Sequence, residues 1–380
     1  MKKILLKSVF FAMLAFSLFS CSDDDKDDKD IILPFDFDIS NTGFYVLNSG
    51  SKGANIPASL TYFDANKNNS QPVKEVFLNQ NKIEPGYGGQ DMLVYGSKMY
   101  ITMTQSNCIY VTDKKGKLLK YNDGSDAIIK PLNSGGQPQQ PRSVAAHSGN
   151  VYASTYDGDI VRIDTTAMTI DKKVATGGTY PEEVTVVNNK LYTVISDYMG
   201  TGAGKNVAVI NLASFTREPD IAVTVNPTKI TSDKNGNIYV ISSGNYNDIL
   251  PALQKIAAGT STVTTIGTDV ATNMEVAGDK LLLMKEVYDN VTKKSSTRLS
   301  YYDMKTDRIV DESFVESGKA DLTNTYNITV DPATNNIYLA TSDYKNEGSM
   351  HIFDGNGKYV NSFKTGGINP MGAYFITGVK

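Results

Sequence analysis

Apolar runs alternate along the chain with short turns rich in Asn, Gly, Lys and Ser. One run recurs seven times at intervals of 40 to 56 residues, and it carries a tyrosine near its start. The instances are GFYVLN at Gly43, KMYITM at Lys98, NVYAST at Asn150, KLYTVI at Lys190, NIYVIS at Asn237, KLLLMK at Lys280 and NIYLAT at Asn336. In the sixth instance Leu282 replaces the tyrosine. Repeats of this length are typical of propeller blades and not of helical solenoids.

Each repeat is predicted to contain four short strands. In the fourth repeat these are residues 181–187, 188–196, 206–212 and 217–223. The first run is apolar at alternate positions and the second is more continuously apolar, as expected for inner strands buried between neighbouring blades. The sequence therefore predicts an all-β, seven-bladed β-propeller of four-stranded blades.

The third predicted strand of six repeats ends in Asp or Asn, and a turn follows. The residues are Asp64, Asp113, Asp164, Asn211, Asp303 and Asp354, whereas the fifth repeat has Ala257. A short carboxylate or amide can accept hydrogen bonds from backbone N–H groups two residues on, which starts a hairpin. We therefore interpret these side chains as turn formers and not as catalytic acids.

The two ends of the repeat region predict how the ring closes. The first repeat begins with its second strand, and residues 368–377 supply an inner-strand pattern at the other end. If the last strand completes the first blade, the ring has no open sheet edge, which is otherwise an aggregation liability. We expect the propeller to span residues 41–380.

The N-terminus is predicted to be a targeting segment. Three lysines in the first seven residues precede an apolar stretch, residues 4–19, which is too short to span a bilayer. It ends in Leu-Phe-Ser-Cys at residues 18–21, which is typical of a lipobox. We expect residues 1–20 to be a lipoprotein signal peptide and Cys21 to be lipidated, so that acyl chains hold the domain at a membrane. An ordinary secretory signal with a chance cysteine is the alternative.

Residues 21–40 are expected to form an acidic, disordered tether. Residues 23–30 carry six Asp and two Lys, while the whole chain has a net charge of −4. The three lysines of the signal peptide and the net −4 of the acidic run nearly cancel, so the rest of the chain carries about −3 and is close to neutral. This balance gives no electrostatic footprint for nucleic acid. Cys108, the cysteine left in the mature domain, lies in a strand-like run and is expected to be a small buried hydrophobe.

A resemblance to known proteins rests on the tyrosine strand, on the strand ending in Asp, and on Gly-Gly-x-x-Pro at 177–181 and 366–370. These motifs resemble YncE-like seven-bladed propellers, and together with the lipobox and acidic run they resemble surface lipoproteins of the Bacteroidetes that capture cobalamin. The resemblance implies an outer-membrane location facing the medium. It also implies capture of cobalamin or a related corrinoid, transfer to a TonB-dependent transporter, and no cofactor. A siderophore or a glycan is the alternative ligand.

Five tyrosines follow the second strands of the last five repeats. They are Tyr156, Tyr198, Tyr246, Tyr288 and Tyr344. A partial ring of tyrosines on one face would suit a large amphipathic ligand, because each ring offers a flat apolar surface and a hydroxyl. The first two repeats lack the tyrosine, so a ligand is expected to lie off-centre. The alternative is that these rings merely cover blade edges.

Residues at the starts of the inner strands form a second predicted ring. They are Gln90, Asp91, Arg142, Tyr180, Glu182, Lys229, Asn273, Tyr326 and Met371. They differ between blades while the strands repeat, which is what a specific site on a symmetric scaffold requires. Alternatively, they only line a water-filled channel.

An enzyme, either a metal-dependent lactonase or a lyase, is the weaker hypothesis. The chain has two histidines, His147 and His351, and neither has an evident partner in the sequence. Metal, nucleotide and hydrolase signatures are missing from it. Arg142 and Lys229 would also oppose a metal ion in the channel. We expect no metal site and no catalysis. A protein-interaction module remains open, because propellers often serve this role.

Overall fold

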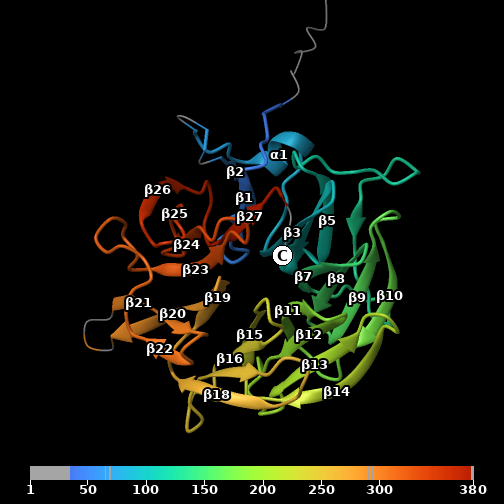
Figure 1. The fold of residues 1–380 in the computed structure, drawn as a ribbon. Coiled ribbons are helices and arrows are strands. Elements are labelled where there is room, and N and C mark those ends of the chain that lie inside the picture. Colours follow the sequence, from blue (N-terminus) through green and yellow to red (C-terminus); the bar gives the residue numbers. More distant parts are fainter. Residues whose placement is uncertain (1–34, 65, 68–69, 290, 292–293, 378–380) are drawn as a thin grey trace, which may run out of the picture. The chain divides into compact units, whose positions relative to one another are not determined.

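The computed structural model describes residues 35–377, apart from residues 65, 68–69, 290 and 292–293. In this part of the chain the strands form seven antiparallel sheets that are arranged as blades around a common axis (Figure 1). Six of the described sheets have four strands and the sheet of blade one has three. The predicted seven-bladed β-propeller is confirmed.

The blades are numbered here by the order of their second strands. Blade one contains β27 (Pro370–Phe375), β1 (Phe44–Asn48) and β2 (Ser59–Phe63), and blade two contains β3 (Gly89–Tyr95), β4 (Lys98–Met103), β5 (Cys108–Asp113) and β6 (Ile128–Ile129). Blade three contains β7 (Pro141–His147), β8 (Asn150–Thr155), β9 (Asp159–Asp164) and β10 (Thr169–Ala175). Blade four contains β11 (Pro181–Val187), β12 (Lys190–Ile195), β13 (Asn206–Asn211) and β14 (Thr216–Ala222).

The last three blades follow the same order. Blade five contains β15 (Pro227–Ser232), β16 (Ile238–Ser242), β17 (Ala252–Ile256) and β18 (Val263–Thr268). Blade six contains β19 (Asn273–Ala277), β20 (Lys280–Asp289), β21 (Lys294–Asp303) and β22 (Arg308–Val310). Blade seven contains β23 (Thr325–Val330), β24 (Ile337–Thr341), β25 (Ser349–Phe353) and β26 (Tyr359–Lys364).

The recurring apolar runs are the second strands, and they build the core. Tyr45, Tyr100 and Tyr239 are fully buried, and Leu282 fills the equivalent place in blade six. Among the described residues the buried side chains fall into seven clusters, each between two neighbouring blades. The repeat therefore recurs because each blade must bury both of its faces against its neighbours.

The six Asp and Asn residues at the ends of the third strands act as predicted. In each turn Oδ1 accepts a hydrogen bond, at 2.8–3.1 Å, from the backbone N–H two residues later. At Ala257 the backbone carbonyl accepts from Thr260 instead. These side chains lie at the end of the blades opposite to the starts of the inner strands.

The C-terminal strand closes the ring, as expected. β27 pairs with β1, with Phe44 opposite Phe375 and Tyr45 opposite Tyr374. The Asn48 side chain adds a hydrogen bond of 2.8 Å to the Thr365 carbonyl. The two ends of the propeller thus share one sheet.

Blade one has a different outer edge. The isolated bridge between Tyr62 and Val73 stands where other blades have a fourth strand, and α1 (Val76–Asn81) packs against β2. The short helix η1 (Thr104–Ser106) lies between β4 and β5 of blade two. In the described part of the chain, neither helix is long or apolar enough to cross a membrane.

Residues 35–40, which we assigned to the tether, lie against blades one and two. Ser40 donates its N–H to the Tyr62 hydroxyl at 2.8 Å, and Lys115 pairs with Asp36. Ser40 also donates to Asp64, at the end of β2. The chain therefore enters the propeller at the end where the third strands finish. The signal peptide, Cys21 and residues 21–34 lie outside the described residues.

Candidate functional site

One face of the ring collects the candidate ligand-binding side chains, and we call it the entry face. It is formed by the starts of the inner strands and by the loops between second and third strands. These segments meet because neighbouring strands within a blade are antiparallel. Blades four to seven present large exposed apolar or aromatic side chains there. They are Tyr198, Met199, Tyr246, Ile249, Leu250, Val287, Tyr288, Val291 and Tyr344.

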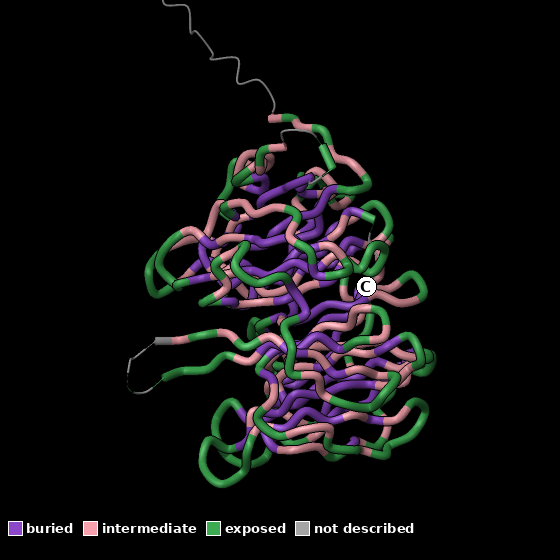
Figure 2. Tube along the Cα trace, turned by 60° about the vertical axis from the view of Figure 1, so that its left-hand side comes forward, coloured by how far each residue is buried: buried purple, intermediate pink, exposed green. Residues whose placement is uncertain are grey.

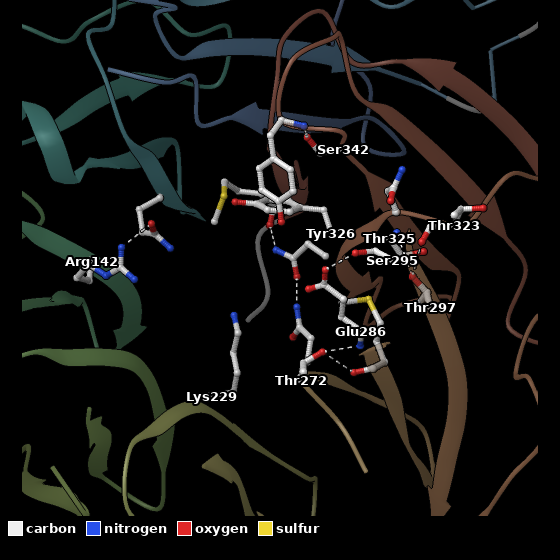
Figure 3. A pocket seen from close by; sticks show the side chains of 17 residues that line it. Arg142, Lys229, Thr272, Glu286, Ser295, Thr297, Thr323, Thr325, Tyr326 and Ser342 are labelled. Atoms are coloured by element: carbon white, nitrogen blue, oxygen red, sulfur yellow. Dashed lines mark hydrogen bonds between the residues drawn. The ribbon is translucent and has the colours of Figure 1, made fainter. Parts of the chain in front are cut away.

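A cavity of about 370 Å³ opens on the entry face, mainly against blades six and seven (Figure 3). Seven of the residues predicted from the sequence line it: Gln90, Arg142, Lys229, Asn273, Tyr326, Tyr344 and Met371. Arg142 and Lys229 approach from one side, while Glu286 and Thr297 lie on the other (Figure 3). The cavity is off-centre, toward the blades that carry the tyrosines.

Sequence reasoning missed much of the cavity wall. The additional lining residues are Thr272, Met284, Glu286, Ser295, Thr297, Thr323, Asn324, Thr325, Asn327 and Ser342. Several come from the hairpin of β20 and β21, which stands out from the body of the propeller (Figure 2). Both strands have ten residues where most others have five to seven. The missed signal is the polar alternation Ser295-x-Thr297, which continues the strand beyond the core.

The hairpin also determines where Tyr288 lies. Tyr288 pairs with Ser295 and Glu286 with Thr297. Side chains two residues apart share one face of a strand, so Tyr288 lies on the same face as Glu286, farther along the hairpin. Tyr288 is 53% exposed and stands beyond the cavity wall.

Irregular pairing at the starts of the inner strands shapes the ring around the channel. The register shifts in the first residues of β3, β7, β11, β15 and β23, whereas β19 pairs regularly with β20. Such bulges bend a strand and re-aim its side chains. The residues at or beside these shifts include Gln90, Arg142, Glu182, Lys229 and Tyr326.

Arg142 is the centre of a network that joins blades two, three and four. Its Nη1 donates to Gln90 Oε1 at 2.6 Å, and Nε and Nη2 donate to Glu182 Oε2 at 2.9 and 2.5 Å. Glu182 Oε1 accepts from the Tyr156 hydroxyl at 3.0 Å. Burial raises the pKa of Tyr156, and Glu182 raises it further against the opposing effect of Arg142.

Lys229 and Glu183 form a second ion pair, at 2.5 Å. Burial lowers the pKa of Lys229, but the Glu183 carboxylate more than compensates, so the pKa lies above its ordinary value. Lys229 therefore remains a cation at the cavity wall. Asn273 donates to Asn327 at 2.8 Å, and Asn327 donates to the Met371 carbonyl, which continues the polar ring.

The five predicted tyrosines do not form one continuous ring. Tyr156 and Tyr198 lie 6.3 Å apart, and Tyr180 lies within 5.4 Å of both, measured between ring centroids. Tyr344 packs edge-on against Tyr326 at 5.6 Å on the cavity wall. Tyr246 is 85% exposed, and its hydroxyl accepts a hydrogen bond from Asn226 at 3.4 Å. Two groups of rings therefore form, one of Tyr156, Tyr180 and Tyr198 and one of Tyr326 and Tyr344, while Tyr246 stands apart from both.

The two histidines and Cys108 are accounted for by local structure. His147 hydrogen-bonds with Asn189 at the opposite end of the blades, and His351 bonds with Ser362 and Thr341 on the outer side of blade seven. Burial raises the pKa of the Cys108 thiol to about 11. Within the described part of the chain, no three His, Cys, Asp or Glu side chains are grouped to hold a metal ion.

Comparisons with known proteins identify the fold. No family model matches the chain, and no curated protein matches it. Among solved structures, a dihydro-heme d1 dehydrogenase, NirN, is 12% identical with a TM-score of 0.56, over 90% of this chain and 76% of that one. A quinonprotein alcohol dehydrogenase-like protein from Bacteroides thetaiotaomicron is 14% identical with a TM-score of 0.55, over 88% and 78%.

Hydrazine synthase from Kuenenia stuttgartiensis is 12% identical with a TM-score of 0.55, over 70% of this chain and 76% of that chain. These proteins share a propeller architecture with this chain and differ widely in what they do. At such low identity the likeness shows the fold alone.

Proposed function

We propose that the protein is a surface-exposed outer-membrane lipoprotein that captures a large small-molecule ligand on its entry face and passes it to a TonB-dependent transporter. One observation carries the proposal. Arg142 lines the 370 Å³ cavity and also stacks, at 4.5 Å, on Tyr156, beside the exposed Tyr198. Arg142 thus links the cavity to the tyrosines. The cavity is near the lower limit for small-molecule sites, so a large ligand would insert one part and rest the remainder on the tyrosines.

Cobalamin or a related corrinoid is the ligand that the sequence resemblance favours. Its size and mixture of apolar rings and amides suit a surface that combines aromatic rings with amide and hydroxyl groups. Isothermal titration of the mature domain with cyanocobalamin tests this assignment. Saturable one-to-one binding at micromolar protein supports it, and no detectable heat at that concentration rejects the corrinoid.

A glycan is the second candidate, because hydroxyl-bearing side chains crowd one side of the cavity. They are Thr272, Ser295, Thr297, Thr323, Thr325 and Ser342. The same titration with ferric siderophores and with oligosaccharides separates these ligands. In each case Tyr198→Ala, Tyr246→Ala and Tyr344→Ala test the face, with exposed Val360→Ala as the control. Unchanged affinity in all three tyrosine variants would put the site elsewhere.

The position of residues 35–40 supports the orientation that capture requires. These residues contact Tyr62, Asp64 and Lys115 at the end of the blades opposite to the entry face. A lipid anchor at Cys21 would then pull on that end and leave the entry face free to meet a ligand. Cys21→Ser tests the lipid anchor, because this variant should lose its membrane association. Protease added to whole cells tests the orientation, because it should cleave the native protein.

Transfer to a transporter is tested separately from ligand capture. Affinity purification of the tagged lipoprotein from its native outer membrane should recover a TonB-dependent receptor. Ligand binding without such a receptor would leave capture standing and remove the proposed partner. Recovery of the receptor without any small-molecule binding would instead favour a protein-interaction module.

A further inference from the structure

A backbone position just before the inner strands has an unusual conformation in four blades. The residue that precedes the strand has a positive φ in blades one, two, four and five. The residues are Asn369 (φ 56°), Gly88 (φ 70°), Tyr180 (φ 61°) and Asn226 (φ 60°). Gly and Asn are the residues that tolerate this left-handed region, whereas a bulky side chain is disfavoured there. Tyr180 is therefore the exception among the four.

The scaffold uses this position in the same way in all four blades. The carbonyl of each residue accepts a hydrogen bond from a backbone N–H just after the neighbouring second strand. The donors are Ser49, Thr104, Ser196 and Ser243, at 2.8–3.1 Å. Because Gly and Asn make this bond as well as Tyr does, the fold does not require an aromatic ring at residue 180.

The asparagine side chains at this position serve the structure. Asn226 Oδ1 accepts from the Asp197 N–H at 3.0 Å, and Asn369 Oδ1 accepts from the Ser342 hydroxyl at 2.9 Å. Each thereby ties its strand to the loop of the preceding blade. Tyr180 instead directs its ring between Tyr156 and Tyr198, at centroid distances of 5.4 and 5.3 Å.

The three rings together form a surface that we call the tyrosine cluster: Tyr156, Tyr180 and Tyr198. It is open to solvent, since Tyr198 is 69% exposed. Its inner edge is polar, because Tyr156 lies under the Arg142 guanidinium and donates to Glu182. Strained residues persist where the surroundings fix them, and they concentrate at ligand clamps. Exposed aromatic groups likewise mark interaction sites.

We propose that the tyrosine cluster is a stacking subsite, next to the cavity, and that Tyr180 keeps its strained backbone because its ring is needed there. The subsite takes a flat ring with an apolar face and a polar edge. The face stacks on the tyrosines, and the edge accepts hydrogen bonds from Arg142, which Glu182 holds in place. A conjugated heterocycle and a pyranose both have this chemistry. This inference rests on the proposed capture function and defines where one part of the ligand lies.

The decisive variant is Tyr180→Asn, which recreates the Asn-Pro dipeptide found at 226–227 and 369–370. Chemical denaturation should show that it is at least as stable as the wild type, because Asn suits the left-handed backbone. Titration should show that affinity falls about tenfold, which is the scale of one lost aromatic contact. Tyr180→Phe, which keeps the ring, should retain affinity within about threefold.

A matched control shows whether the strained backbone at Tyr180 is kept because its ring binds a ligand or because its ring packs in the fold. Phe215 also has a positive φ, of 55°, but it is buried between blades three and four. Phe215→Asn should lower stability, since the ring is part of the core. If Tyr180→Asn is likewise less stable than the wild type, Tyr180 is held by packing and the inference is wrong.

Titration with several ligands identifies which kind of ring the tyrosine cluster binds. Cyanocobalamin, dicyanocobinamide (which lacks the nucleotide base), methyl glycosides and oligosaccharides are titrated into wild type and Tyr180→Asn. A loss of affinity confined to cyanocobalamin assigns a heterocycle to the cluster, and a loss confined to sugars assigns a pyranose. Equal affinity of both proteins for a ligand that binds overturns the subsite but leaves capture intact. Failure of all these probes and of ferric siderophores to bind the wild type would count against the capture function itself.

Discussion

The guanidinium carbon of Arg142 lies 4.5 Å from the centroid of the Tyr156 ring, and both side chains bond to the carboxylate of Glu182. Arg142 is thus held by a carboxylate on one side and by an aromatic face on the other. Its side chain is 20% exposed and that of Glu182 is 11% exposed. The guanidinium is a prepared hydrogen-bond donor at the channel mouth, not a free surface charge.

This arrangement predicts the response to charge removal. Arg142→Met leaves the largely buried Glu182 carboxylate without its cation, so we expect the free energy of unfolding to fall by about 1–3 kcal/mol. The double variant Arg142→Met/Glu182→Gln removes both charges and should recover much of that loss. Urea denaturation measures both. A double variant no more stable than the single one would show that the pair matters through packing alone.

Ring closure predicts a large cost for one buried aromatic residue. Phe44 is fully buried and packs against Phe63, Tyr338, Phe363 and Phe375, which come from both ends of the chain. We expect Phe44→Ala to lower the free energy of unfolding by about 3–5 kcal/mol. Val360→Ala, at an exposed position in the same region, should change it by less than about 0.5 kcal/mol. If Phe44→Ala lowers the free energy of unfolding by less than about 1 kcal/mol, this aromatic cluster does not hold the ring closed.

Replacing the aspartates that form the turns after the third strands should change stability without changing ligand binding. Asp113 Oδ1 accepts from the N–H groups of Lys115 and Lys117, and Asp354 makes the same two bonds in blade seven. Asp113→Ala and Asp354→Ala should each cost about 1–2 kcal/mol of stability. Ligand affinity should not change, because both turns lie opposite to the entry face. A fall in affinity with stability intact would mean that these acids belong to a site.

Much of this fold could be predicted because its signals are local. The alternation of apolar residues marked the strands, and Asp113-Lys-Lys-Gly marked a turn by the chemistry of one side chain. The closing strand was found because residues 368–377 repeat the pattern that the first blade lacks. Such signals depend on neighbours within a few residues.

The candidate site was predicted less fully because its geometry depends on distant pairing. Arg142 and Lys229 were placed in the channel ring from the sequence, but their ion pairs with Glu182 and Glu183, on another strand, were not predicted. The reach of the β20–β21 hairpin and the positive φ of Tyr180 also escaped sequence reasoning. A one-residue bulge or a left-handed residue has no periodic signature, so tertiary structure alone reveals it.

Burial of Cys108 predicts slow thiol chemistry. The side chain is 4% exposed, and burial raises its pKa to about 11, which leaves little thiolate at neutral pH. A domain that begins after Cys21 should react with a thiol reagent far more slowly in buffer than in denaturant, where one equivalent should react rapidly. Equal rates under the two conditions would show that the interface between blades one and two opens readily.

His351 predicts a specific pH dependence of stability. It is 6% exposed in β25, and burial lowers its pKa below the ordinary value of 6.5, although Asp321 opposes the shift. The unfolded chain therefore binds a proton near pH 6.5 that the folded chain does not bind, so stability falls as the pH drops below that value. His351→Gln can still hydrogen-bond with Ser362 but cannot titrate. Between pH 7.5 and 5.5 its unfolding free energy should fall less steeply than that of the wild type, by at most about 1.4 kcal/mol per pH unit. Parallel curves for the two proteins would show that the imidazole is protonated as easily in the fold as outside it.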